Sequence, residues 1–158
     1  MGNIFAGSEI VEIGIQIENN GRDFYNMLAG RSENEQAREI FRFLAGEEEK
    51  HIKIFEGILE KTQKFAPQGL DADDYLRYMK VLAEEHVFTQ KDRGEEIARK
   101  TGSDKEAVEV AIRFEEDSIV FYTGIKRIVP EYDHKVIEAL IMQEEGHLMQ
   151  LLDMRKIL

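Results

Sequence analysis

The chain has 158 residues, 34% of them charged and two of them proline, and its formal net charge is −11. This length suits one domain, 1–158, and the composition favours a helical protein over a disordered one. The negative charge argues against binding to nucleic acid or to an anionic membrane surface, and the absence of cysteine excludes disulfides and iron–sulfur clusters.

Two long helices are predicted in the first part of the chain. Ser8 is a candidate N-cap for a helix that runs to about Ala29 and stops at Gly30. Ser32 begins a capping box, Ser-x-x-Glu, which predicts a second helix that extends to roughly Thr62. Because the loop between them is short, we expect an antiparallel helix hairpin.

Residues 63–103 are predicted to form a long crossover that includes further helix from Ala72 to about Arg93. This segment could cap the core of its own bundle or reach a second protomer. We expect a homodimer, and an exchange of halves between protomers is one route to it.

A second capping box, at Ser103, opens a third helix that Pro130 ends, and a fourth helix covers about 132–156. The predicted fold is therefore all-α: a four-helix bundle of two antiparallel hairpins joined by a long, partly helical crossover. The sequence has no apolar run of membrane-spanning length and no signal-peptide pattern at its start, so we expect no membrane partner and a cytoplasmic location.

The two predicted hairpins, about 8–62 and 104–156, are an internal repeat. Residues 11–18 align without gaps onto residues 108–115, and Phe24-Tyr25 falls on Phe121-Tyr122. Within this repeat a lone Glu is followed by a Glu-x-x-His motif, twice. The six residues concerned are Glu18, Glu48, His51, Glu115, Glu144 and His147.

The helical pattern places these glutamates on apolar faces. The positions three, four and seven residues from Glu48 include Phe41, Leu44, Ile52 and Phe55. An unpaired carboxylate in a core costs several kcal/mol, and four close together also repel. Protonation would relieve one or two of them, whereas two divalent cations would balance all four.

The sequence therefore predicts a dinuclear metal site made by the six residues. Oxygen and imidazole ligands without a thiolate suit iron or manganese, and zinc is an alternative. The competing interpretation is a charged helical surface with two buried histidines. Tyr25 and Tyr122 lie two turns from Glu18 and Glu115. We interpret them either as ordinary core aromatics or as hydrogen-bond donors that orient the ligand carboxylates.

Two further acidic–histidine groups are interpreted without a metal. Glu131-x-x-His134 follows Pro130 and has no counterpart in the other half, so we expect a surface or capping pair. The run Glu84-Glu85-His86 lacks the motif spacing and is interpreted as a solvated helix face.

The motifs Ile17-Glu18-x-x-Gly21-x-x-Phe24-Tyr25 and Glu-x-x-His resemble the rubrerythrin branch of the ferritin-like di-iron carboxylate superfamily. Residues 114–122 are similar to its third helix. The resemblance implies a ferritin-like bundle that holds two iron ions. In that family Glu18 and Glu115 would be terminal ligands, Glu48 and Glu144 would bridge the ions, and His51 and His147 would complete one ion each.

Two departures from the family pattern affect the expected function. Rubrerythrins proper carry a C-terminal rubredoxin domain with four cysteines, whereas this chain ends at Leu158 and has none. Ser118 stands where they carry a further glutamate that is associated with peroxide reduction.

The resemblance implies a di-iron oxidoreductase that reduces hydrogen peroxide or dioxygen with electrons from a separate donor such as a rubredoxin. The alternatives are a ferroxidase or iron-binding protein without multiple turnovers, and a metal-stabilised structural or interaction module.

Overall fold

In the computed structural model, residues 3–62, 72–85 and 93–158 are described, and every regular element in these ranges is helical. The elements in chain order are α1 (Asn3–Arg31), α2 (Glu35–Thr62), α3 (Ala72–Glu85), α4 (Gly94–Arg99), α5 (Asp104–Ile125), a short 3-10 helix (Glu131–Asp133) and α6 (His134–Ile157).

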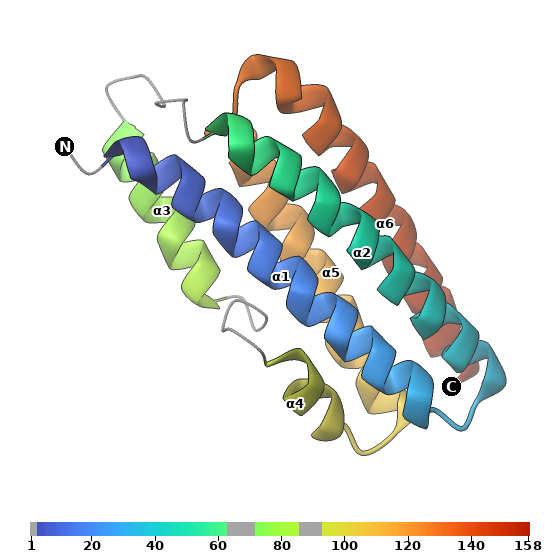
Figure 1. Cartoon of the computed structure of the whole chain (residues 1–158). Coiled ribbons are helices and arrows are strands. Elements are labelled where there is room, and N and C mark those ends of the chain that lie inside the picture. Colours follow the sequence, from blue (N-terminus) through green and yellow to red (C-terminus); the bar gives the residue numbers. More distant parts are fainter. Residues whose placement is uncertain (1–2, 63–71, 86–92) are drawn as a thin grey trace.

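The four long helices form a bundle of two hairpins, as predicted. α1 packs against α2 and α5 packs against α6, and the two hairpins meet through α1 with α5 and α2 with α6 (Figure 1). The core between them contains seven of the largest fully buried side chains, which are Phe24, Tyr25, Phe41, Phe55, Phe114, Phe121 and Tyr122. The bundle also buries the six residues of the predicted metal site, which we call the polar site: Glu18, Glu48, His51, Glu115, Glu144 and His147.

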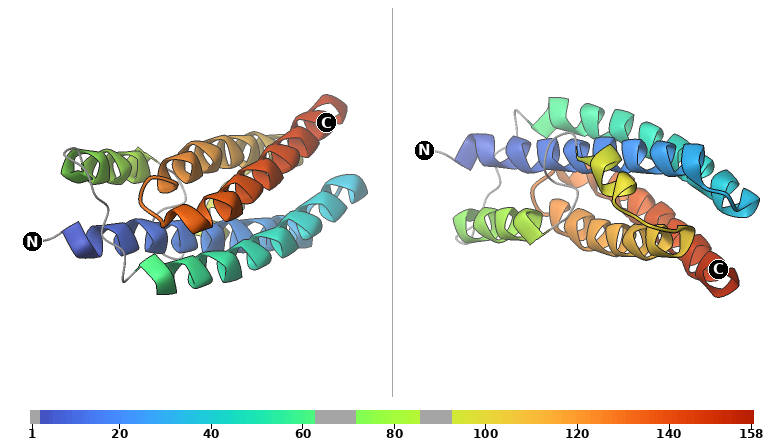
Figure 2. Two further views of the ribbon diagram at one scale, coloured as in Figure 1. Left: turned by 90° about the horizontal axis from the view of Figure 1, so that it is seen from above. Right: turned by 90° about the horizontal axis from the view of Figure 1, so that it is seen from below.

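The described parts of the crossover lie against the chain's own bundle. α3 and α4 both pack on α1, and in Figure 2 α3 lies beside α1 and beyond the end of α5. Leu76 and Met79 of α3 are buried in the core, and the Tyr75 hydroxyl donates to the Gly124 carbonyl at 2.5 Å. The crossover was expected either to cap its own bundle or to reach a second protomer, and the contacts of its described residues favour capping of its own bundle.

Several predicted helix ends were wrong. α1 begins at Asn3, so Ser8 is a buried residue inside the helix and does not cap it, and the helix passes Gly30 to end at Arg31. Serine is only mildly unfavourable inside a helix, so it is a weak signal for a helix start. Of the predicted helix from Ala72 to about Arg93, the structure describes the part that forms α3 (Ala72–Glu85), and residues 86–92 lie outside the described ranges.

The cap of α2 is Asn34 and not Ser32. The Asn34 side-chain oxygen accepts from the Ala37 backbone N–H at 3.0 Å, which satisfies one of the free donors at the helix start. Ser103 caps α5 as predicted, because its hydroxyl oxygen accepts from the Glu106 N–H at 3.1 Å.

α5 ends at Ile125, earlier than the prediction at Pro130. The following turn is closed by bonds of the i to i+3 type, including Ile128 N–H to the Ile125 carbonyl at 2.9 Å. Such bonds tighten the chain at a helix end, and a proline disfavours helical backbone at the residue before it.

A glycine allows α1 and α5 to approach each other beside the polar site. A Cβ at position 21 would lie 2.6 Å from the Phe114 ring, closer than real contacts allow. The ring therefore occupies the space that a side chain at Gly21 would need. Among the described helices, none combines the length and apolar character needed to cross a membrane.

Candidate dinuclear metal site

The structure brings all six predicted residues together in the centre of the bundle. Each long helix contributes: Glu18 comes from α1, Glu48 and His51 from α2, Glu115 from α5, and Glu144 and His147 from α6. Five of the side chains are 0% exposed and His147 is 4% exposed. The alternative of a charged helical surface is therefore wrong for these glutamates.

The six residues form two overlapping groups, each with ligand atoms within 4.8 Å of one another. One group contains Glu18 and His51, and the other contains Glu115 and His147. Glu48 and Glu144 belong to both groups. Each group thus has one Glu and one His from a single hairpin, together with the two shared carboxylates.

Several of the buried oxygens lack hydrogen-bond partners among the described residues. Both carboxylate oxygens of Glu48 and one each of Glu18 and Glu115 are in this state. A buried polar atom without a partner is expensive, and a carboxylate more so. Oxygen atoms and imidazole nitrogens grouped in this way are the donors that divalent iron, manganese and zinc accept, so the residues fit a pair of such ions.

His51 turns one ring nitrogen to the carboxylates and the other outward. Its Nδ1 lies 2.7 Å from Glu144 Oε1 and 3.5 Å from Glu18 Oε2. Its Nε2 lies 2.8 Å from Oε1 of Gln143, an acceptor, so the Nε2–H donates. The outer hydrogen bond therefore leaves Nδ1 as the nitrogen that faces the metal position.

His147 has the same orientation. Its Nδ1 is 3.6 Å from Glu144 Oε2, and its Nε2 is 3.5 Å from Glu47 Oε1. The two imidazole rings are stacked with centroids 5.9 Å apart. Gln143 and Glu47 were not predicted as site residues. Their signal in the sequence is that each directly precedes the glutamate of a Glu-x-x-His motif.

The two predicted tyrosines contact the site across the bundle. The Tyr25 hydroxyl of α1 donates to Glu115 Oε1 of α5 at 2.7 Å, and the Tyr122 hydroxyl of α5 donates to Glu18 of α1. Burial and the neighbouring carboxylates raise the pKa of both tyrosines well above 10, so both hydroxyls keep their protons.

Without a metal, the cluster relieves its charge by holding protons. Burial is the larger cause and repulsion from Glu144 the next, and together they raise the pKa of Glu18 to about 7 and the pKa of Glu115 well above its usual value. Burial opposes the charged form of His51, but its contacts with Glu144 and Glu18 outweigh this and raise its pKa to about 11. A metal ion must therefore displace protons to bind.

The remaining predictions concern residues outside the cluster. Glu131 is exposed and His134 half-buried at the start of α6, as expected for a surface pair, and Glu84 is exposed. His86 lies outside the described residues. Ser118 is fully buried one turn after Glu115.

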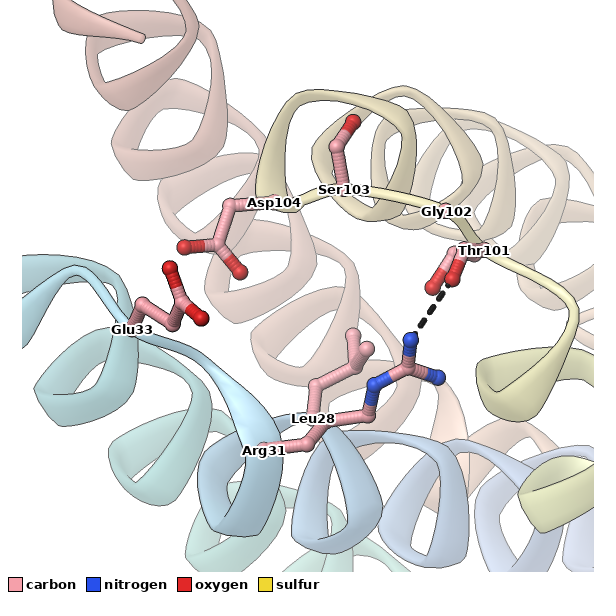
Figure 3. A pocket seen from close by; sticks show the side chains of 7 residues that line it. All are labelled: Leu28, Arg31, Glu33, Thr101, Gly102, Ser103 and Asp104. Carbon is pink, nitrogen blue, oxygen red and sulfur yellow. Dashed lines mark hydrogen bonds between the residues drawn. The ribbon is translucent and has the colours of Figure 1, made fainter.

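A pocket of about 280 Å³ lies apart from the cluster, and its described lining includes none of the six residues. Arg31 at the end of α1 donates there to the Thr101 carbonyl at 2.8 Å (Figure 3). It also donates to the Ala98 carbonyl at 2.7 Å. Glu33 and Asp104 point toward each other across it. Arg31 thus joins α1 to α4 and to the segment between α4 and α5.

A helical bundle with four buried glutamates and two histidines in overlapping groups defines the class of carboxylate-rich dinuclear proteins. The rubrerythrin family model matches residues 9–155, and the chain belongs to this family. A crystal structure of a candidate ferritin-like diiron-carboxylate protein from Thermotoga maritima is similar, with 26% sequence identity and a TM-score of 0.71. The match covers 95% of this chain and 94% of that chain. No curated protein matched the sequence.

Proposed function

We propose that the protein is a non-haem di-iron oxidoreductase that reduces hydrogen peroxide or dioxygen with electrons from a separate donor protein, such as a rubredoxin. The observation that carries the proposal is the pair of overlapping groups that share Glu48 and Glu144. Membership of the rubrerythrin family supports the same chemistry.

The residues would divide between two metal positions. Glu18 and His51 would hold one ion, Glu115 and His147 the other, and Glu48 and Glu144 would bridge them. Four carboxylates balance the charge of two divalent cations, and the imidazoles add ligands without net charge. A bound pair of ferrous ions supplies two electrons and Lewis acidity to an oxidant.

The chain itself would exclude water and place protons. The reduction of one hydrogen peroxide to two waters takes up two electrons and two protons. Tyr25 and Tyr122 keep their hydroxyl protons beside Glu115 and Glu18, and their hydrogen bonds fix the orientation of these carboxylates. The Phe41 ring packs on the Tyr25 ring and the Phe55 ring on the Tyr122 ring, and these contacts hold the two tyrosine rings in place.

Ser118 favours a second candidate function. It is fully buried one turn from Glu115, where the resembling family carries a glutamate associated with peroxide reduction. With a hydroxyl there instead of a further carboxylate, iron binding or ferroxidase activity without multiple turnovers is the alternative.

The test is an anaerobic titration of the ferrous protein with hydrogen peroxide, followed by its absorption spectrum. We expect oxidation at one equivalent per site and repeated turnover when a reductant is supplied. Oxidation that stops after one equivalent despite the reductant would favour the second candidate. No spectral change at all would refute redox function. Glu144→Gln should abolish the signal, and Glu145→Gln, at the exposed neighbouring position, is its matched control.

A further inference from the structure

The metal-facing residues of the two halves repeat, but the residues behind the histidines do not. Glu47 and Gln143 are separated by 96 positions, the same spacing as Glu48 and Glu144 and as His51 and His147. They are therefore equivalent positions in the two hairpins, and one is a carboxylate where the other is a neutral amide.

The two residues contact the histidines reciprocally. Gln143 of α6 accepts from His51 of α2 at 2.8 Å, whereas Glu47 of α2 lies 3.5 Å from the outer nitrogen of His147 of α6. The His51 side therefore has a neutral hydrogen-bond acceptor, and the His147 side has a negative charge close to the ring.

The surroundings of Glu47 also differ from those of Gln143. Lys50 pairs with Glu47 at 3.0 Å, and the residue 96 positions after Lys50 is Gly146. The rings of Phe43 and His147 pack edge to face with centroids 6.0 Å apart, and the residue equivalent to Phe43 is Ala139. His147 thus contacts Glu47 and Phe43, whereas the residues at the equivalent positions in the other half are Gln143 and Ala139.

A carboxylate behind a metal-binding imidazole makes the ring a stronger donor to the metal. Glu47 acts on His147 by its charge even though 3.5 Å exceeds a normal hydrogen-bond length. Lys50 reduces this effect only in part, because its side chain is 75% exposed and water screens it, whereas that of Glu47 is 16% exposed.

We propose that Glu47 is a positioning residue that makes the two metal positions unequal, so that the position of His147 fills before that of His51. This inference rests on the proposed dinuclear site. It adds an order of loading, which neither the ligands nor their repeat would produce, because a symmetric site would place a single ion at either position equally.

Cobalt(II) is a suitable probe, because it shifts the N–H signals of histidine rings that bind it. We would record these signals with the whole protein at one equivalent of cobalt(II) per chain. The His147 signal is assigned as the one whose frequency Glu47→Gln changes, and the His51 signal as the one whose frequency Gln143→Glu changes; the occupancies are then read from the intensities of the two signals. In the unaltered protein we expect the His147 position to be favoured about tenfold.

For each variant we expect a ratio between the occupancies of the His147 and His51 positions that differs from the ratio in the unaltered protein. Glu47→Gln gives both histidines an amide and should bring the occupancy ratio close to one. Gln143→Glu gives both a carboxylate and should do the same. The double exchange, Glu47→Gln with Gln143→Glu, should reverse the preference toward His51. A merely structural role of Glu47 would not predict this reversal.

Equal occupancy in the unaltered protein, or a ratio that Glu47→Gln does not change, would overturn the inference while leaving the dinuclear site intact. A protein that takes up no cobalt(II) would overturn the proposed site and the inference together. Thermal unfolding of each metal-free variant checks that it folds. Because Gln143 is exposed, Gln143→Glu keeps the test available if Glu47→Gln unfolds.

Discussion

The α1–α2 hairpin and the α5–α6 hairpin hold the same metal-facing residues but differ in what surrounds them. α3 and α4 pack on α1, whereas α5 contacts the crossover through α3. Glu48 and Glu144 belong to both groups of ligands, so a change in either of them disturbs both metal positions. The residues behind them affect one position at a time and can differ between the halves.

Contacts behind the cluster cross from one hairpin to the other. Tyr25 bonds Glu115 and Tyr122 bonds Glu18, while His51 contacts Gln143 and His147 contacts Glu47. Each hairpin therefore helps to orient ligands of the other. The repeat of the sequence becomes a site only when the two halves are packed together.

The largest effect should come from the residues that both halves share. Glu48→Gln should lower the affinity at both metal positions by more than about a hundredfold, because loss of a ligand exceeds the 10–100-fold cost of losing a residue behind it. Glu18→Gln should act mainly on the position of His51. Isothermal titration calorimetry with the metal ion measures the affinity of both variants. Two ions retained by Glu48→Gln would contradict a shared role.

The tyrosines test whether the halves act across the bundle. Tyr25→Phe should weaken the position of Glu115 and His147 by about tenfold, and Tyr122→Phe the position of Glu18 and His51 by a similar factor. The ring that packs the core is kept, so the fold should be retained. If each variant affected the position in its own hairpin instead, the reciprocal contacts would have no energetic role.

The metal-free protein should lose stability as the pH rises. The pKa of Glu18 is raised from 4.5 to about 7, so the folded state holds more protons between these values and its stability falls as pH increases. The pKa of His51 is raised from 6.5 to about 11, and its contribution, complete below 6.5, is lost as the pH rises through about 11. Both shifts have the same sign.

Thermal unfolding after chelation, at several values between about pH 5 and pH 9, measures this trend. The metal-bound protein should not follow it, because metal binding favours the deprotonated ligands and strengthens as the pH rises. The difference between the two forms should therefore widen with pH. A difference that is constant over this range would contradict protons held in place of metal ions.

The smallest effects concern the caps of the two hairpins. Asn34→Ala and Ser103→Ala should each lower the free energy of unfolding by about 1 kcal/mol, because each removes a bonded cap. Ser32→Ala should be close to neutral, since the Ser32 hydroxyl has no hydrogen-bond partner among the described residues. Urea unfolding compares them, and an equal loss in Ser32→Ala would restore Ser32 as the cap.

The sequence was sufficient to predict the hairpins and the six clustered residues, because a carboxylate on an apolar helix face is costly unless a cation or a proton balances it. It was not sufficient where the structure depends on contacts between distant segments. The start of α4 is held by Asn20, whose side chain accepts from the backbone N–H groups of Arg93 and Gly94 at 3.0 and 3.3 Å. No local signal predicts this contact.

The same reason explains the residues missed behind the histidines. Glu47 and Gln143 look like surface residues of their own helices, and only the packing of α2 against α6 places them on the histidine of the opposite helix. The prediction of the α2 cap was wrong for a different reason, because Ser32 and Asn34 both have side chains that suit an N-cap. In the structure α2 begins at Glu35, so Asn34 is the residue that directly precedes the helix and caps it.

The most direct test of the dinuclear site is the metal content of the protein after anaerobic loading with ferrous iron and removal of unbound metal. Elemental analysis should find two ions per chain, and the double variant Glu48→Gln with Glu144→Gln should retain none. Fewer than one ion per chain in the unaltered protein, or the same content in the double variant, would contradict the account.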